Sequence, residues 1–345
     1  MGRADGTTTP ADDGFRMPPE TARHERTLMG WPCRTELWKE QIASARSQYA
    51  GVANAVAEFE PVTMVVTDAG AAAGARAMLS AAVEIIELPL DDSWMRDNGP
   101  FFTLDSTGRR AGVHFRFNAW GQKFEGWSRD EAAGGALARR FGDVAYEMPV
   151  VLEGGSVIMD AAGQVLTTEQ CLLNPNRNPE LDRDGIERAL RDGLGATGVV
   201  WLANGEAEDR DTDGHIDGIA VITDSNALIL LSRPPGDPDH EPMADNRARA
   251  VAAGYEVIDF PVLAHDVVDG ERVSHSYLNL YLCNGAAIVP TAGGPSAGED
   301  EEAVERLREA LPGREVVGVP ALVVAYGGGG PHCITQQVPA RVGGP

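Results

Sequence analysis

The sequence lacks any apolar run long enough to cross a lipid bilayer, so we expect no transmembrane helix. Its first twenty residues contain no apolar segment of the kind found in secretory signal peptides, and we expect no export signal there. Basic residues are also scarce: 29 Lys and Arg stand against 52 Asp and Glu, which gives a formal net charge of -23. Such a chain repels a phosphate backbone and an anionic membrane, so we expect neither nucleic acid nor membrane as a partner. The charge favours a small cationic partner, although solubility alone would also explain it.

Cysteine is scarce as well, and no two cysteines form a C-x-x-C motif. The four are Cys33, Cys171, Cys283 and Cys333. A chain of 345 residues does not need disulfides to hold its core, so we expect free thiols in a reducing compartment and predict a cytoplasmic protein. The lack of paired cysteines and of an H-E-x-x-H motif disfavours zinc, and we predict no metal site.

No long linker rich in proline, glycine or serine divides the chain. We expect residues 1–16 to form a disordered N-terminal tail and residues 17–345 to form a single domain. Hydrophobic periodicity predicts helices at 36–58, 69–82, 130–141, 181–194, 242–253 and 300–311. A short apolar strand follows each helix, at 61–67, 83–89, 143–149, 198–203, 256–262 and 314–320.

Loops and β-hairpins follow most of these strands. The hairpins are predicted at 100–117, 156–168, 219–231 and 277–290, and the last has Asn284-Gly285 at its tip, a strong signal for a tight turn. A unit of helix, strand, loop and hairpin is thus used about five times. This pattern predicts one pseudo-repetitive α/β domain. A doubly wound parallel sheet is the alternative, and the regularly placed antiparallel hairpins argue against it.

Five polar, glycine-containing loops connect the strands to the hairpins. They lie at 91–100, 151–156, 203–217, 263–276 and 326–333. Because glycine lets the backbone approach a ligand, each loop alone is weak evidence for a site. If the unit repeats, however, the loops occupy equivalent places and are expected to converge on one centre.

The third loop contains the acidic run DRDTDGHID. The first, third, fifth and sixth positions of a calcium-binding EF-hand loop are matched by Asp209, Asp211, Asp213 and Gly214. The twelfth position holds Ala220 where that motif needs Glu, and a strand pattern follows where it needs a helix, so calcium is disfavoured. His215 and Asp217 are two residues apart and would face the same side of an extended chain, which suits two residues acting on one substrate. We interpret Asp209 as a solvated residue.

Cys333 is the best candidate for a nucleophile. It follows four glycines at the start of a strand-like run, whereas Cys171 and Cys283 lie in apolar runs typical of buried thiols. His332 would point to the opposite face of that strand. The partner base is therefore expected from another loop, and His215 is the natural candidate.

Carboxylates narrow the chemistry of this Cys and His pair. Asp97, Glu153 and Asp217 lie in three of the five loops. Several carboxylates around a thiol raise its pKa, a cost that makes sense if the substrate is itself a cation. A planar guanidinium, which pairs bidentately with carboxylates, fits that requirement. The residue types therefore favour an enzyme that modifies guanidines.

The sequence resembles the agmatine deiminases of the guanidine-modifying superfamily. The matching stretches are TLMGWP, SWMRDNGP, FNAWG, VLEGGS, TTEQCLLNPNRNP, DTDGHID, SYLNLYLCNGAAIVP and GGGGPHCITQQVP, which extend from about Met17 to Pro339. The resemblance implies the pentein fold, a five-bladed pseudo-symmetric α/β-propeller. Two residues and one segment depart from the family pattern. Gln122 stands where Gly is usual, Gly218 stands where a residue with a side chain is often found, and residues 291–302 differ in sequence.

The resemblance also implies a role for each candidate. Cys333 matches the nucleophile, His215 the general acid and base, and Asp97 and Asp217 the carboxylates that hold the guanidinium, while Glu153 completes the polar cluster. Catalysis would pass through a covalent thiouronium intermediate and require no metal or organic cofactor. Further contacts with the substrate are expected from Trp94 and Trp120, which would pack on its methylene chain, and from Asp211 or Asp213, which would bind its distal amine.

The expected reaction converts agmatine and water to N-carbamoylputrescine and ammonia, a step of polyamine synthesis. Two alternatives stay open: a deiminase for another guanidine, such as arginine, a peptidyl-arginine or a modified guanidine, and a non-catalytic polyamine-binding protein. A homo-oligomer is also left open.

Overall fold

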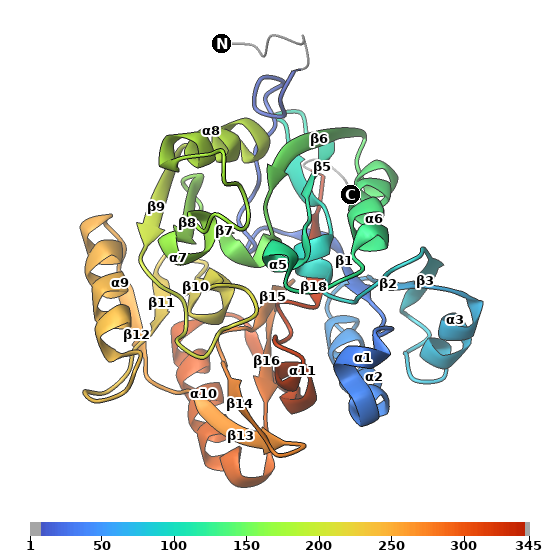
Figure 1. Cartoon of the computed structure of the whole chain (residues 1–345), viewed down its shortest axis with the longest axis vertical. Helices are drawn as coiled ribbons and strands as arrows, with labels where there is room; N and C mark the ends of the chain where they lie inside the picture. Colours follow the sequence, from blue (N-terminus) through green and yellow to red (C-terminus); the bar gives the residue numbers. More distant parts are fainter. Residues whose placement is uncertain (1–7, 342–345) are drawn as a thin grey trace.

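The computed structural model describes residues 8–341. Over that range five small sheets form a ring around the centre of the molecule, and a separate two-stranded hairpin lies beside the ring (Figure 1). Each sheet of the ring contains an antiparallel pair and a further strand parallel to it. The predicted five-bladed α/β-propeller is therefore confirmed, and the doubly wound sheet is excluded.

The blades follow one another along the chain. Blade one contains β18 (Thr335–Pro339), β1 (His24–Gly30), β2 (Val62–Val66) and β3 (Glu84–Glu87); blade two β4 (Phe101–Leu104), β5 (Arg110–Arg116) and β6 (Val144–Val151); blade three β7 (Val157–Met159), β8 (Gln164–Thr168) and β9 (Gly198–Leu202); blade four β10 (Ala220–Ile222), β11 (Leu228–Leu231) and β12 (Val257–Phe260); blade five β15 (Tyr281–Cys283), β16 (Ala286–Thr291) and β17 (Glu315–Pro320). Because β18 pairs with β1, the two ends of the described chain meet in one blade and close the ring.

One helix in each blade connects the antiparallel pair to the parallel strand and lies on the outside of the ring (Figure 1). These helices are α2 (Ile42–Val56), α6 (Ser128–Phe141), α8 (Arg183–Leu194), α9 (His240–Ala252) and α10 (Ala297–Ala310). The remaining helices are α1 (Thr35–Trp38), α3 (Ala69–Arg76), α4 (Met95–Asn98), α5 (Ala119–Gln122), α7 (Glu169–Leu172) and α11 (Leu322–Tyr326), with single 3-10 turns η1 (Lys39–Gln41), η2 (Gly154–Ser156), η3 (Ile216–Gly218) and η4 (Gly294–Ser296). None of the described helices is long and apolar enough to cross a membrane.

Helix α8 shows how the sequence specifies these elements. The Asp182 side chain caps its N-terminus by accepting a hydrogen bond from the Gly185 amide, and Gly195 ends it in the left-handed conformation with φ 67°. Ile186, Leu190 and Leu194 recur every four residues and are buried against the sheet. Their burial contributes about 1.5–3 kcal/mol per side chain, enough to hold the helix on the blade.

The hairpin of β13 (Ala264–Val268) and β14 (Glu271–His275) corrects the prediction of a loop at 263–276. Asp269 and Gly270 form its two-residue turn, both with positive φ, at 51° and 81°. An Asp-Gly pair between alternating residues is a hairpin signal, so the sequence contained the information. The hairpin belongs to none of the five blades.

The predicted N-terminal tail is wrong for residues 8–16. Phe15 is buried and packs edge-on against Tyr146, while Arg16 exchanges backbone hydrogen bonds with Leu104 at the end of β4. The folded part of the chain therefore begins before residue 17. Residues 1–7 lie outside the described part of the chain.

Candidate active site

Four segments from different blades meet near the centre of the ring. Asp97 lies on α4, Glu153 directly precedes η2, His215 directly precedes η3, and Cys333 lies in the turn before β18. The segment η2 contacts both α4 and η3, and α4 also contacts β18. The sequence prediction that equivalent loops converge is therefore correct for these residues.

The candidate side chains surround a small space and are at most 5% exposed. Cys333 Sγ lies 3.5 Å from Asp217 Oδ2, and His215 Nδ1 lies 3.9 Å from Asp97 Oδ1. Gly155 forms one wall. A Cβ atom there would lie 2.5 Å from His215 Nδ1, 2.8 Å from Asp217 Oδ2 and 3.0 Å from Asp97 Oδ1, so any side chain at this position would displace the three groups.

A pocket of about 610 Å³ leads from this space to the surface. Cys333, His215 and Asp217 lie among its lining residues, as does Ser274 from the β13–β14 hairpin. Further carboxylates line it farther out, at Glu206, Glu208, Asp209, Asp211 and Glu271. Two arginines, Arg210 and Arg272, also line the pocket, but the carboxylates outnumber them, so the pocket favours a cation over an anion.

Asp97 and Asp217 are both buried but differ in their partners. Asp97 accepts hydrogen bonds from the Gly155 amide and from Trp120 Nε1, each at 2.9 Å, and these donors are neutral. Burial raises its pKa, and the charge of His215 only partly opposes that rise. Burial would also raise the pKa of Asp217, but its hydrogen bond with His332 and that residue's charge outweigh burial and lower the pKa.

The surroundings of Cys333 disfavour the thiolate form of its side chain. Burial, followed by the charges of Asp217 and Asp97, raises its pKa well above the ordinary value. Asn279 partly opposes this effect, because its Nδ2 donates a hydrogen bond to Sγ at 3.1 Å. Its Oδ1 also accepts from the Cys333 amide at 3.2 Å, which fixes the position of the nucleophile. Asn279 was not predicted as a site residue, although it lies in the matching stretch SYLNLYLCNGAAIVP.

His332 does not point away from the site as a strand would require, because residues 331–334 form a turn. Its Nδ1 lies 2.8 Å from Asp217 Oδ2 and its Nε2 lies 2.8 Å from Glu20 Oε2. Both ring nitrogens must donate to satisfy two carboxylates, so the ring is an imidazolium. Burial and the charge of Arg96 lower the pKa of His332, but Glu20 and Asp217 outweigh them and raise it. His332, which is itself held by Glu20, thus fixes the position of the Asp217 carboxylate.

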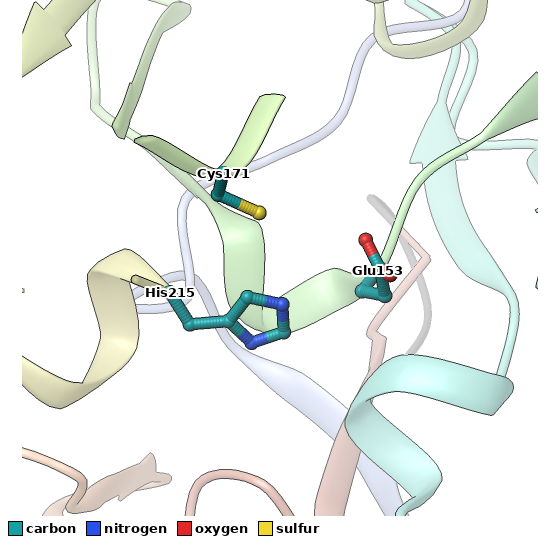
Figure 2. A group of neighbouring side chains, drawn as sticks. All are labelled: Glu153, Cys171 and His215. Carbon is teal, nitrogen blue, oxygen red and sulfur yellow. The ribbon is translucent and has the colours of Figure 1, made fainter. Parts of the chain in front are cut away.

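Glu153 is fully buried and ion-paired. Arg177 Nε lies 2.7 Å from Glu153 Oε1. The other carboxylate oxygen of Glu153 has no hydrogen-bond partner among the described residues, and neither ring nitrogen of His215 has one. Ligand atoms of Glu153, His215 and Cys171 all lie within 4.8 Å of one another (Figure 2). Glu153 and His215 are therefore neighbours, with no hydrogen bond between the carboxylate and the imidazole in this structure.

The acidic run 209–217 is an ordered loop. Asp209 is not merely solvated: its side chain accepts hydrogen bonds from the amides of Thr212 at 3.0 Å, Gly214 at 2.9 Å and His215 at 3.2 Å. Three such bonds satisfy the loop backbone and fix the position of His215. The interpretation of Asp209 as a solvated residue is therefore wrong.

Two aspartates of this loop, Asp211 and Asp213, are the predicted acceptors for a distal amine. Asp211 lines the pocket. Asp213 does not, and its carboxylate is occupied by Lys123 at 2.7 Å, by Asn176 at 2.9 Å and by Arg177. Asp213 is therefore a structural residue that holds Arg177.

The two tryptophans are near the site but do not line the pocket. Trp120 Nε1 donates to Asp97, and its ring packs edge-on against Phe117 and Phe124. Trp94 is 5% exposed and packs against Trp38, at a ring distance of 5.8 Å. The contacts seen are with the protein, so their proposed packing on a substrate chain stays a prediction.

Comparison with known proteins shows the family to which the chain belongs. The model of the family described as Porphyromonas-type peptidyl-arginine deiminase matches residues 16–339. The agmatine deiminase of Stutzerimonas stutzeri is 37% identical, over 97% of this chain and 98% of that protein. The solved agmatine deiminase of Enterococcus faecalis superposes with a TM-score of 0.90 at 31% identity, over 98% of this chain and 99% of that one. The agmatine deiminase of C. jejuni, solved with substrate bound, superposes with a TM-score of 0.85 at 27% identity, over 94% of this chain and 96% of that one. The fold, the convergent site and these matches agree, and the chain belongs to the Porphyromonas-type peptidyl-arginine deiminase family.

Proposed function

We propose that the protein hydrolyses agmatine to N-carbamoylputrescine and ammonia. The observation that carries the proposal is the placement of the Cys333 thiol beside Asp217, with Asp97 and His215 on the same small space. Two carboxylates facing a thiol oppose its ionisation, and a guanidinium bound between them reverses that effect. Relatives over nearly the full length are named agmatine deiminases.

In the first half-reaction, Asp97 and Asp217 hold the guanidinium nitrogens with its central carbon near Cys333 Sγ. The thiol proton passes to His215 as sulfur attacks the carbon. His215 returns this proton to the departing nitrogen, which leaves as ammonia. A positively charged thiouronium remains on Cys333.

In the second half-reaction, His215 removes a proton from water, and the hydroxide adds to the thiouronium carbon. Loss of the sulfur, which takes the proton back from His215, restores the Cys333 thiol. The hydroxyl of the adduct gives its proton to solvent, where the released ammonia takes it up, and the neutral ureido group of the product leaves. Glu153 faces His215 and stabilises the imidazolium that forms in each half. In this role it orients the base and does not contact the substrate.

The outer carboxylates fit the second charge of agmatine. Asp211 is the preferred acceptor for the distal ammonium, because it lines the pocket and its side chain is not tied to Lys123 and Arg177 as that of Asp213 is. Glu206 also lines the pocket, and burial raises its pKa to about 7, which a bound cation would reverse. An arginine substrate would bring a carboxylate into this acidic pocket, which disfavours it.

The compartment and the partner of the protein are also part of the proposal. We place it in the cytoplasm, because its four cysteines are free thiols, and we propose a small cationic guanidine as its partner. The ureido product would feed polyamine synthesis. A non-catalytic polyamine-binding protein would need the acidic pocket but not the buried thiol.

The test is release of ammonia and of a ureido product from a panel of agmatine, arginine, a peptidyl-arginine and a simple alkylguanidine. Wild type should turn over agmatine fastest, and Cys333→Ala should be inactive while it unfolds at the same temperature. If wild type turns over none of the guanidines, the enzyme assignment fails. If arginine is preferred, only the choice of substrate fails.

A further inference from the structure

Cys171 is a buried thiol that the proposed reaction does not use. It lies on α7 and is fully buried, and burial together with the charge of Glu153 raises its pKa. Figure 2 shows its sulfur and one ring nitrogen of His215 pointing into the same gap, with the Glu153 carboxylate on the other side. Since Nδ1 is the nitrogen near Asp97, the nitrogen in this gap is Nε2.

These three side chains come from separate parts of blades three and four, yet their ligand atoms all lie within 4.8 Å of one another. Each residue is at most 3% exposed. Neither ring nitrogen of His215 has a hydrogen-bond partner among the described residues. Of the two carboxylate oxygens of Glu153, only one has such a partner. Buried polar atoms without partners are rare in folded proteins, and such atoms aimed at a common point are what a bound ion would satisfy.

The donor set identifies the kind of ion. One thiolate, one imidazole and one carboxylate are ligands of zinc, whereas calcium and magnesium bind oxygen only. Ligand atoms around a tetrahedral zinc, at about 2.0–2.3 Å from the metal, stand roughly 3.5 Å apart. The observed group would therefore contract by about 1 Å, which side-chain rotation can supply.

We propose that Cys171, His215 Nε2 and Glu153 form a binding site for zinc or a similar soft divalent ion, and that an ion bound there inhibits the enzyme. The ion enters past His215, which lines the substrate pocket, and water from the pocket supplies a fourth ligand. Arg177 holds the far oxygen of Glu153 and so orients that ligand from outside the site. Binding releases the Cys171 proton and therefore strengthens as pH rises.

Inhibition follows from the position of the ion and rests on the proposed function of His215. A metal on Nε2 occupies the lone pair of that nitrogen, so the single proton of the neutral ring lies on Nδ1. Nδ1 then has no free lone pair with which to accept the proton of the thiol or of water. The ion would leave the Cys333 thiol itself unbound.

Binding can be tested without activity, in the full-length Cys333→Ala variant. Titration with Co²⁺ should produce the intense near-ultraviolet band of a cobalt–thiolate bond, and zinc should displace it. X-ray absorption at the zinc edge should show one sulfur ligand at about 2.3 Å with nitrogen and oxygen ligands near 2.0 Å. Adding Cys171→Ser should remove the band and the sulfur ligand. No sulfur ligand, or a band that survives the loss of Cys171, overturns the proposal.

Inhibition is tested separately, in protein with Cys333 intact. Zinc should inhibit wild type at least tenfold more strongly than Cys171→Ser or Cys171→Ala, both of which keep activity in the presence of a chelator. Equal inhibition of wild type and both variants would mean that zinc acts through Cys333, and the proposal would be wrong. If no guanidine is turned over, the function fails while the binding result still stands on its own.

Discussion

The charge of Asp217 should suppress the reactivity of Cys333 in the protein without substrate. The carboxylate oxygen and the sulfur are 3.5 Å apart and both side chains are buried. At that distance two charges interact by about 5 kcal/mol in a medium of effective dielectric constant about 20. An energy of that size corresponds to a factor of roughly a thousand or more in the thiolate population at fixed pH.

The His332 imidazolium reduces the net effect, because it is bound to Asp217 at 2.8 Å. In Asp217→Asn the Glu20 carboxylate still binds the other ring nitrogen and favours the charged ring. Removing the aspartate then leaves a positive charge near the thiol. Even if His332 loses its proton, we expect Cys333 to be alkylated at least about tenfold faster in Asp217→Asn than in wild type.

The assay is alkylation by iodoacetamide, a neutral reagent, at pH 8 without substrate. Mass spectrometry follows the peptide that contains Cys333, and the partly exposed Cys33 serves as an internal reference. Asp211→Asn is the matched control, because it removes a carboxylate of the same pocket that does not contact the sulfur. Unchanged or slower alkylation of Cys333 in a folded Asp217→Asn variant would refute the argument, including the need for a cationic substrate.

Three further predictions concern binding and stability. Asp211→Asn should raise KM for agmatine about tenfold and leave kcat within about twofold, because a hydrogen bond to a charged group contributes about 1.5 kcal/mol at the low end of its range. Steady-state ammonia release measures this effect, and an alkylguanidine without an amine should be unaffected. Glu20→Gln should lower the free energy of unfolding by about 3 kcal/mol at pH 7, because the charges of His332 and Arg96 outweigh burial and lower the pKa of Glu20 from 4.5 to about 2. That contribution is complete above pH 4.5 and is lost as pH falls towards 2, so urea unfolding curves of variant and wild type should converge there, and a constant difference would contradict the linkage. Gln122→Gly should raise the free energy of unfolding by about 0.5–1 kcal/mol, because Gln122 has φ 64°, whereas Ala55→Gly within helix α2 should lower it by about 1 kcal/mol.

The repeated architecture could be predicted from the sequence because it depends on local patterns. Alternating helical and strand periods placed the five outer helices and the parallel strands within a few residues of their observed bounds. The hairpin β13–β14 was missed because polar residues and one glycine were interpreted as loop, although Asp269-Gly270 marks its turn. The closure of the ring by β18 and β1 is a contact between the two ends of the described chain, and no local pattern contains it.

The site divides in the same way. Residues that face the small space around Cys333 were predicted from their chemistry and the family resemblance, and they do converge. The residues missed are those that hold them: Glu20 bonds to His332 across 312 positions, and Asn279 holds Cys333 across 54. A side chain whose role is to hydrogen-bond a site residue does not belong to a sequence motif for that role. Such a residue is found only when the structure shows which partner each buried donor and acceptor has.

The hydrogen-bond partners of the three central carboxylates explain why the site needs a cationic substrate. Asp217 has the His332 imidazolium behind it, and Glu153 has the Arg177 guanidinium. Asp97 accepts hydrogen bonds from the neutral donors Gly155 and Trp120. Burial raises its pKa, and the more distant His215 opposes that rise only in part. The protein thus balances two of its three central carboxylates and leaves Asp97 to be balanced by the substrate. A guanidinium bound to Asp97 offsets the charge that also opposes ionisation of Cys333, so binding and activation of the nucleophile are the same electrostatic event.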